Sequence, residues 1–502
     1  MNQNNIVDII DVEQRHYKII KEILAKFLPY KKVLAYGSRV KWNASETSDL
    51  DLAVFNATQK EIYEAKEAFD ESNIPFIIQI LNWETIPQDF KENIEQKYHI
   101  LQKEDDWGIF KLGDVVEVII DNRGRNPKHY CKRGIPVIDN FMIKNDKFPN
   151  LEDAKRFLDE RTYKTFIRKF TNHKDVLITL VGNGYGNVTQ SPYKESAIIQ
   201  NTVGLRGGAK LNNDFLFYNL KFNNEEILNL DRGAVQPSIK VGDLMDLEIS
   251  LPALKEQKAI AEILSSLDDK IDLLHRQNKT LENLAETLFR HYFIDNAKDD
   301  WKVGKLGDII SVIESGSRPK GGIDPDLTCG IASIGAESIK GIGNFNFSAT
   351  KFIKYEFFSK MKKGKVYDKD VLIYKDGAYI GRKGMFGRGF PFQEFAVNEH
   401  VFILRANELS SQYFLYFALD EEELRCLNTN SAQPGLNQAS MRSFEIVIPP
   451  KLMITKFDKE VEPLVDKILY NAKQIQTLEK LRDTLLPKLI SGAIRVNYKE
   501  NE

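Results

Sequence analysis

A stretch near the N-terminus, YGSRVKWNASETSDLDLAVF at 36–55, carries residue types and spacing suited to metal-dependent chemistry. Gly37 and Ser38 follow a short apolar run, and a turn of this kind can cradle a phosphate with backbone N–H groups. Asp49 and Asp51 lie two positions apart on a second apolar run, so both carboxylates point to one face of a strand. Such a pair can hold magnesium ions. The stretch is therefore a candidate nucleotide-binding and metal-binding site.

The elements around this stretch must position its residues. The pattern of 1–104 predicts a helix at about 8–28, strands at 31–36, 49–55 and 75–82, and helices at 58–71 and 85–97. With the Gly-Ser and Asp-x-Asp spacing, this order resembles a minimal nucleotidyltransferase domain of the polymerase-beta-like superfamily, an α/β fold. The resemblance implies a third carboxylate on a neighbouring strand, which would hold the metal that activates the attacking hydroxyl.

The strand expected to supply that carboxylate reads IPFIIQIL (74–81) and carries Gln79 at the matching position, followed by Asn82. An amide offers a carbonyl oxygen but no charge, so it weakens a site for a hard dication and provides no base. Three interpretations remain: an active transferase that uses magnesium and a nucleoside triphosphate, a degenerate domain that still binds a nucleotide or a partner, and a structural appendage. We favour the degenerate domain.

The composition indicates a globular chain with several domains. Its 502 residues suffice for roughly three domains. No apolar run approaches the ~20 residues of a membrane span. The three cysteines (Cys131, Cys329 and Cys426) form no CxxC pair and no disulfide framework, so we expect a reducing, cytoplasmic location. The net charge of −2 argues against a uniformly basic nucleic-acid binder but leaves room for local basic surfaces.

Motifs for ATP-dependent and methyl-transfer chemistry are absent from the sequence. It contains no GxxxxGK[ST] phosphate loop, no Asn/Asp-Pro-Pro-Tyr/Phe stretch and no His/Cys cluster at metal-ligand spacing. If the chain takes part in such chemistry, another subunit must supply the site. We therefore assign no catalytic residue to this chain and no cofactor to its main function.

An internal repeat organises most of the sequence. WGIFKLGD at 107–114 matches WKVGKLGD at 301–308, and the Asp-Val-Leu-Ile run that begins at Asp175 matches the run that begins at Asp370. Gln236-Pro237 matches Gln433-Pro434, and LENLAETL at 281–288 matches LEKLRDTL at 478–485. The landmarks keep their order, which indicates a duplicated unit. Each copy begins with a mixed, strand-rich globular part and ends with a long helix.

Both long helices carry an apolar seam whose spacing alternates between four and three residues, as in a coiled coil. The first seam consists of Ile260, Leu264, Leu267, Ile271, Leu274, Leu281, Ala285 and Leu288, and Asn278 interrupts it. The second consists of Phe457, Val461, Leu464, Ile468, Ile475, Leu478 and Leu485, with Asn471 and Arg482 as polar members. We expect the helices to pair antiparallel within the chain and to place the globular parts at opposite ends, about a pseudo-twofold axis. The alternative is two separate amphipathic helices that each cover their own domain.

Cations, amides and aromatic residues gather in loop-like stretches of both globular parts, a mixture suited to phosphate contact and base readout. In the first part the candidate DNA-binding residues are Arg123, Arg125, Lys128, Tyr130, Asn183, Tyr185, Asn187 and Gln190. In the second part they are Arg318, Lys320, Lys375, Tyr379, Arg382 and Lys383. Recurrence at matching places is stronger evidence than either set alone.

The stretch LPALKEQKAIAEILSSLDDKIDLLHRQNKTLENLAETLF (251–289) resembles the helical region of specificity subunits of type I restriction–modification systems, and GIASIGAESIKG (330–341) resembles their target-recognition domains. The resemblance covers 107–495. It implies an α+β multidomain chain with two target-recognition domains, at 107–252 and 301–449, and two helical regions, at 253–296 and 450–495, that form an antiparallel intrachain coiled coil.

The resemblance also implies a function. Each recognition domain would read one half of a bipartite, asymmetric DNA site, and the helices would set the spacer. Two methyltransferase subunits that bind S-adenosylmethionine, and translocase–nuclease restriction subunits that bind ATP, would complete the complex, while this chain would be non-catalytic. Two alternatives are an active nucleotidyltransferase delivered by the recognition domains and an orphan DNA-binding regulator.

Overall fold

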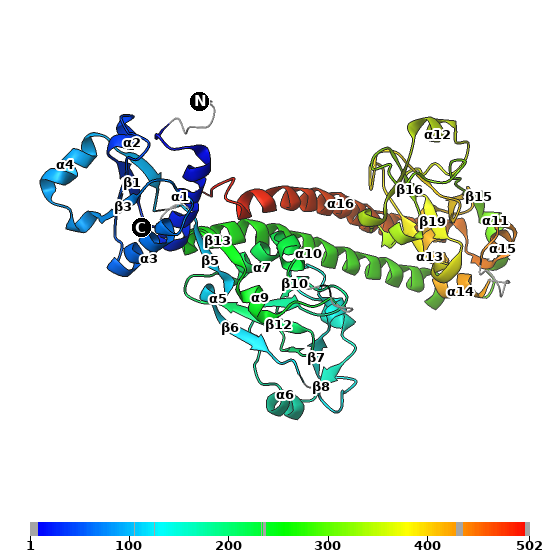
Figure 1. Ribbon diagram of the computed structural model, residues 1–502. Helices are drawn as coiled ribbons and strands as arrows, with labels where there is room; N and C mark the ends of the chain where they lie inside the picture. Colours follow the sequence, from blue (N-terminus) through cyan, green and yellow to red (C-terminus); the bar gives the residue numbers. More distant parts are fainter. Residues whose placement is uncertain are drawn as a thin grey trace. The chain divides into compact units, whose positions relative to one another are not determined.

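The computed structural model describes residues 9–104, 106–124, 126–231, 233, 237–427 and 435–496 (Figure 1). The chain forms two units, one made of Met1–Ser266 with Arg482–Glu502 and the other of Leu267–Leu481. Each unit contains a segment of both long helices. Within the described residues, no helix combines the length and apolar character needed to cross a membrane.

The N-terminal domain is a four-stranded sheet in the order β3-β2-β1-β4. Its strands are β1 (Val33–Tyr36), β2 (Leu50–Val54), β3 (Ile78–Asn82) and β4 (His99–Gln102). The helices α1 (Gln14–Phe27) and α3 (Gln59–Asp70) bury Ile20, Leu24 and Ile62 together with apolar residues of the sheet. The short helices α2 (Ser38–Lys41) and α4 (Gln88–Gln96) complete the domain. All the predicted helices and strands are present, and β4 was not predicted.

The first globular lobe follows as β5 (Gly108–Lys111) to β13 (Glu248–Leu251), which pair with each other. Its main sheet has the order β10-β9-β12-β6, and a second sheet has the order β11-β7-β8. These strands are β6 (Val116–Asp121), β7 (Ile135–Ile138), β8 (Phe157–Leu158), β9 (Val176–Thr179), β10 (Val188–Gln190), β11 (Ala197–Ile198) and β12 (Thr202–Gly207). The helices are α5 (Leu112–Val115), α6 (Glu160–Phe166), α7 (Asn213–Phe222), α8 (Asn224–Leu228) and α9 (Val241–Met245).

The second globular lobe, from β14 (Lys302–Lys305) to β23 (Glu445–Ile448), repeats this arrangement. Its main sheet is β15-β22-β19-β20-β17 and its second sheet is β18-β16-β21. These strands are β15 (Ile310–Ser315), β16 (Ile331–Ile334), β17 (Gly341–Ile342), β18 (Lys351–Ile353), β19 (Val371–Tyr374), β20 (Lys383–Met385), β21 (Phe395–Val397) and β22 (Val401–Ala406). The helices are α11 (Leu306–Ile309), α12 (Tyr355–Lys360), α13 (Gln412–Ala418), α14 (Glu421–Cys426) and α15 (Gln438–Ser443).

A buried ion pair recurs at the same place in both main sheets. Asp175, before β9, accepts hydrogen bonds of 2.9 and 2.7 Å from Arg206 on β12. Asp370, before β19, accepts bonds of 2.7 and 2.6 Å from Arg405 on β22. Both aspartates are almost fully buried. The duplicated Asp-Val-Leu-Ile run therefore marks a framework contact that ties the central strand of each lobe to its neighbour.

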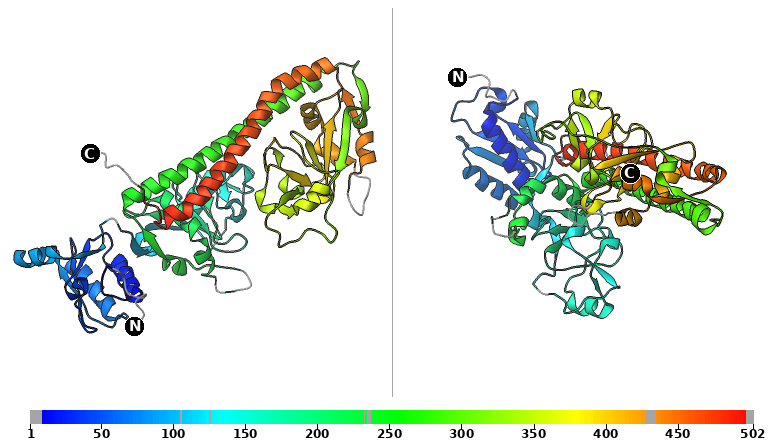
Figure 2. Two further views of the ribbon diagram at one scale, coloured as in Figure 1. Left: turned by 90° about the horizontal axis from the view of Figure 1, so that it is seen from above. Right: turned by 90° about the vertical axis from the view of Figure 1, so that its right-hand side faces the viewer.

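The long helices α10 (Leu254–Arg290) and α16 (Lys451–Ile490) contact each other within each unit. In the first unit, Leu264 and Leu489 belong to the same apolar cluster. In the second unit, where the two segments lie side by side (Figure 2), Ile271 clusters with Ile475, whereas Ala285 shares a core with Phe457. Residue numbers thus rise along one helix as they fall along the other, so the segments run antiparallel.

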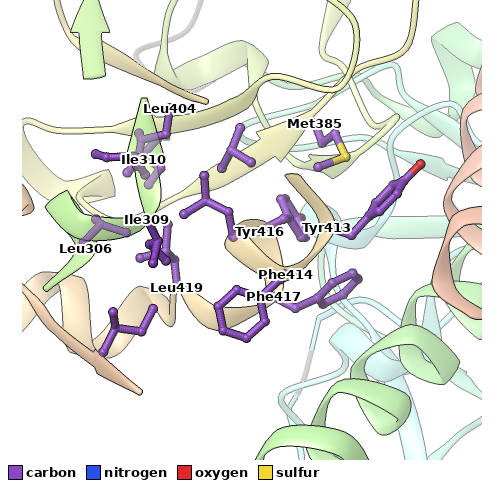
Figure 3. Packing of buried hydrophobic residues seen from close by; sticks show 14 of the residues in the cluster. Leu306, Ile309, Ile310, Met385, Leu404, Tyr413, Phe414, Tyr416, Phe417 and Leu419 are labelled. Atoms are coloured by element: carbon purple, nitrogen blue, oxygen red, sulfur yellow. The ribbon is translucent and has the colours of Figure 1, made fainter. Parts of the chain in front are cut away.

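The polar members of the two seams meet each other. Asn471, which is fully buried, donates a hydrogen bond of 2.8 Å to the Oδ1 of Asn278 and one of 2.9 Å to Gln277. Most of the apolar seam residues belong to apolar clusters, and the same helices also bury residues against the lobes. Figure 3 shows members of the core of the second lobe, contributed by α11, β15, β20, β22 and α13.

Candidate functional sites

The turn after β1 and the start of β2 bring the predicted N-terminal site together. Gly37 has φ of +83°, and a Cβ added there would lie 2.3 Å from the Oδ2 of Asp51. Only glycine allows this close approach. The pair of residues Asp51 and Gln79 is in register across β2 and β3. The short helix α2 begins at Ser38, directly after Gly37. The Gly-Ser turn, the strand with Asp51 and the strand with Gln79 therefore lie next to one another.

The donor set at this site fits a divalent cation only in part. The Nε2 of Gln79 donates a hydrogen bond of 2.7 Å to the Oδ2 of Asp49, so one oxygen of the predicted metal ligand already has an internal partner. Burial, and then the charge of Asp49, raise the pKa of Asp51. Asn82 turns away and donates to the carbonyl of Ala57 at 2.9 Å. Within the described residues, no group of three or more His, Cys, Asp and Glu side chains is placed to hold a metal.

Sequence reasoning did not single out Arg39, whose side chain binds backbone carbonyls next to this site. The guanidinium is almost fully buried and donates to the carbonyls of Ser48 at 2.9 Å and Asp11 at 2.8 Å. It also lies 3.7 Å from the ring centroid of Phe76. Arg39 therefore anchors the loop that carries Asp49. The Gly-Ser-Arg triplet itself was the available signal.

The basic loop of the first lobe, residues 122–134, is only partly free for an external ligand. Arg123 is paired with Asp121 at 2.8 Å, and Arg125 lies outside the described residues. Lys128 is exposed. Tyr130 stacks its ring under Arg156, with 4.8 Å between the guanidinium carbon and the ring centroid, and shares a hydrogen bond of 3.0 Å with it. The loop therefore reaches a cation that sequence reasoning missed.

The glycine-rich loop at 182–193 places its predicted residues differently. Asn183 is exposed, and Tyr185 packs against the lobe's core. Asn187 donates to the carbonyl of Ile143 at 3.0 Å. Gln190 is fully buried and donates to Asp214 at 2.9 Å. The amides of Asn187 and Gln190 thus donate to groups inside the lobe.

In the second lobe some of the predicted residues are exposed, and others place a cation over an aromatic ring. Arg318, Lys320 and Tyr379 are exposed, and Arg382 lies 4.0 Å over the ring of Tyr379. Lys375 points its ammonium over the ring of Phe402, 5.1 Å from the centroid.

Lys383, predicted from the sequence to bind DNA, makes internal hydrogen bonds in the second lobe. Its ammonium donates to the carbonyls of Tyr416 at 2.8 Å and Leu419 at 2.7 Å. Burial lowers the pKa of Lys383. The side chain of Lys383 therefore links β20 to the end of α13.

A cavity of about 600 Å³ opens beside Arg318 in the second lobe. Arg318 forms an ion pair with Glu399 and lies 3.2 Å from the Nε2 of His400. The Nδ1 of His400 lies 2.7 Å from the Oδ2 of Asp376. Sequence reasoning did not select Glu399, His400 or Asp376. The signal for Glu399 and His400 was the polar run Asn-Glu-His directly before an apolar strand.

The duplicated lobes, the paired long helices and the N-terminal sheet with its Gly-Ser and Asp-x-Asp residues define a specificity-subunit architecture joined to a nucleotidyltransferase-like domain. The family model described as "Type I restriction modification DNA specificity domain" matches residues 104–283 and 298–480, and the model "Polymerase beta, Nucleotidyltransferase" matches 18–106. The chain belongs to the type I restriction–modification DNA specificity family, which confirms both resemblances seen in the sequence.

Individual relatives agree with this assignment. The chain is 29% identical over 420 residues to the type I restriction enzyme MjaIX specificity subunit of Methanocaldococcus jannaschii, covering 78% of this chain and 94% of that protein. Its N-terminal part is 36% identical over 99 residues to the probable protein adenylyltransferase MntA of Haemophilus influenzae, covering 19% of this chain and 87% of that protein. The crystal structure of a type I restriction–modification S subunit from M. genitalium has the same fold, with a TM-score of 0.51 and 18% identity, covering 80% of this chain and 98% of that chain.

Proposed function

We propose that this chain is the DNA-specificity subunit of a type I restriction–modification complex and that it binds a bipartite, asymmetric duplex site. The family match over both lobes carries this proposal. Residues 107–252 and 301–449 would be the target-recognition domains, each reading one half-site. Exposed Lys128 in the first lobe and exposed Lys320 in the second are suited to phosphate contact, which positions a protein on DNA without reading sequence.

The helical regions, 253–296 and 450–495, would form an antiparallel coiled coil that sets the spacer between the half-sites. The antiparallel contacts within each unit and the buried Asn278–Asn471 hydrogen bond support this role. A buried polar pair fixes helix register because a slipped register would leave Asn471 without a partner.

The partners of this subunit would be two methyltransferase subunits, which bind S-adenosylmethionine, and restriction subunits, which bind ATP. Neither cofactor has a recognisable motif in this sequence. On this proposal the chain is non-catalytic in restriction and modification, and its own contribution is to position the methyltransferases on DNA.

Mapping of DNA methylation in the source organism, with and without this gene, tests the proposal. The expected result is a methylated motif that disappears from the deletion strain. It consists of two short half-site sequences, called words below, separated by a fixed spacer. An unchanged methylation map would refute it.

We further propose that the N-terminal domain is a degenerate nucleotidyltransferase that keeps the fold and lacks transfer activity. The hydrogen bond from Gln79 to Asp49 supports this, because the amide takes a metal-facing oxygen and supplies no third charge. On this proposal the domain still binds a nucleoside triphosphate at Gly37 and Ser38. Purified chain incubated with labelled nucleoside triphosphates and magnesium is expected to form no labelled product.

A second function, an active nucleotidyltransferase delivered to DNA or to a partner, is favoured by one observation. The relative MntA, named a probable protein adenylyltransferase, matches the N-terminal domain at 36% identity. Labelled product that disappears in the Asp49→Ala variant would establish this function in place of the degenerate domain.

A further inference from the structure

One position recurs in both lobes with a different side chain. Gln200 stands two residues before β12, and Glu399 stands two residues before β22. Each also precedes the framework arginine of its lobe, Arg206 or Arg405, by six residues. The shared strand order makes these positions equivalent.

In the first lobe a guanidinium holds Gln200. The Nη2 of Arg156 donates to the Oε1 of Gln200 at 3.2 Å, while Asp139 and Tyr130 bind the rest of the guanidinium. The backbone of Gln200 has φ of 54°, in the left-handed region that residues other than glycine seldom adopt. Such a conformation persists where the surroundings impose it, and it is a reason to ask for a function.

In the second lobe a different arginine holds Glu399. Arg318 comes from the loop between β15 and β16, whereas Arg156 directly precedes β8. His400 adds a contact of 3.2 Å to the Oε1 of Glu399. The Oε2 of Glu399 is buried and has no hydrogen-bond partner among the described residues. This carboxylate lines the cavity of about 600 Å³.

The basic loops converge on these positions. Tyr130 of the 122–134 loop stacks on the arginine that binds Gln200, and Arg318 of the 316–330 loop binds Glu399 directly. The loops follow β6 and β15, which pair with β12 and β22, so the strand pairing itself brings each loop to the equivalent residue. A basic loop and a polar side chain bound by an arginine thus occur together in each lobe.

We propose that Gln200 and Glu399 are the specificity-determining residues at the centre of the two readers, each contacting a base edge of its own half-site. The Glu399 carboxylate lines the cavity, and a carboxylate acceptor suits the exocyclic amine of cytosine or adenine. The Nε2 of Gln200 suits an acceptor such as the N7 of a purine. Arg156 limits the rotamers of Gln200, and Arg318 limits those of Glu399. Because the side chain cannot turn to suit a different base, the wrong base leaves a polar group unpaired.

This inference rests on the proposed DNA-specificity function, and one experiment separates the two. The complex is isolated from the source cells through an affinity tag on this chain, as the native form and as the near-isosteric variants Glu399→Gln and Gln200→Glu. Each complex selects sequences from a library of random duplexes. Glu445→Gln, an exposed glutamate on β23 outside the cavity lining, is the matched control.

The native and Glu445→Gln complexes are expected to select the same two words around one spacer. Glu399→Gln should change base preference by about 10-fold or more at one or two positions of one word, and Gln200→Glu should do so in the other word. If the native complex selects no bipartite motif, the proposed function itself fails. If the native motif is present and the variants select the native words, or lose both words together, the inference is overturned.

Discussion

The two lobes share a framework and differ in the residues that we propose read DNA. Asp175 with Arg206 and Asp370 with Arg405 are the same buried ion pair at the same strand junction. By contrast, the position two residues before β12 is a glutamine in the first lobe, and the equivalent position before β22 is a glutamate in the second. Even the arginine that holds it comes from a different element in each lobe.

This difference teaches how a duplicated domain can acquire a second specificity. A framework contact between buried strands cannot change in one copy without loss of packing, since an unpaired buried charge is strongly destabilising. A side chain at the end of a strand, held by a loop residue, can change with little effect on the core. We therefore expect the two lobes to share the contacts that stabilise their fold and to recognise different DNA half-sites.

Replacement of one whole lobe tests the comparison with the largest expected effect. Exchange of 107–250 for the corresponding part of another specificity subunit should replace one word of the recognised site and leave the other word and the spacer unchanged. Methylation mapping of the resulting strain measures this. A change in both words would show that the lobes do not read independently.

Removal of the framework carboxylates should affect both lobes equally. Asp175→Ala and Asp370→Ala each remove the buried carboxylate that binds a partly buried arginine, and each should lower the free energy of unfolding by about 1–3 kcal/mol. Urea unfolding with hydrogen exchange measures the loss and locates it. The control is Asp246→Ala, which breaks an exposed pair with Lys111 and should lose less than about 1 kcal/mol. A small effect in either lobe would contradict a shared framework.

The helix pair offers a test of the spacer. Replacing both Asn278 and Asn471 with leucine should raise the free energy of unfolding by about 1 kcal/mol and loosen the helix register, because the buried hydrogen bond between them is lost. Thermal unfolding and the methylation map measure the two effects. Asn278→Leu alone should destabilise, since it removes one acceptor from the fully buried Asn471. An unchanged spacer and undiminished site fidelity in the double variant would count against the proposal that the helix pair sets the spacer.

The N-terminal domain should have the smallest effect on site choice, as it lies outside the repeat. Asp49→Ala should leave the two words and the spacer unchanged. In the Gln79→Asp variant the amide donor is lost and a third negative charge lies beside Asp49, so stability should rise on addition of magnesium. Thermal unfolding with and without magnesium measures this. An equal magnesium response in the native chain would show that the native site already holds the metal.

Much of this organisation could be predicted from the sequence because periodicity and repetition report on packing. The Asp-Val-Leu-Ile runs marked β9 and β19, and the seam spacing marked the paired faces of α10 and α16. Gln79 was predicted at the position of a missing carboxylate, and it lies there beside Asp49.

The internal use of individual cations could not be predicted. Lys383 lies in a glycine-rich, basic stretch and was predicted to bind DNA, yet carbonyls brought from α13 by the fold capture its ammonium. Likewise, Arg156 and Glu399 acquire their roles from neighbours far away in the sequence. Single-residue roles of this kind depend on tertiary contacts, which local patterns do not encode.

The central claim is that each lobe reads one word by itself. The most direct test is a chain in which the second lobe, 301–449, is replaced by a copy of the first, 107–252, with the methylated motif mapped in cells that carry only this chain. The account predicts a site in which the same word occurs twice around a spacer. Methylation of the original asymmetric site, or a second word unrelated to the first, would contradict it.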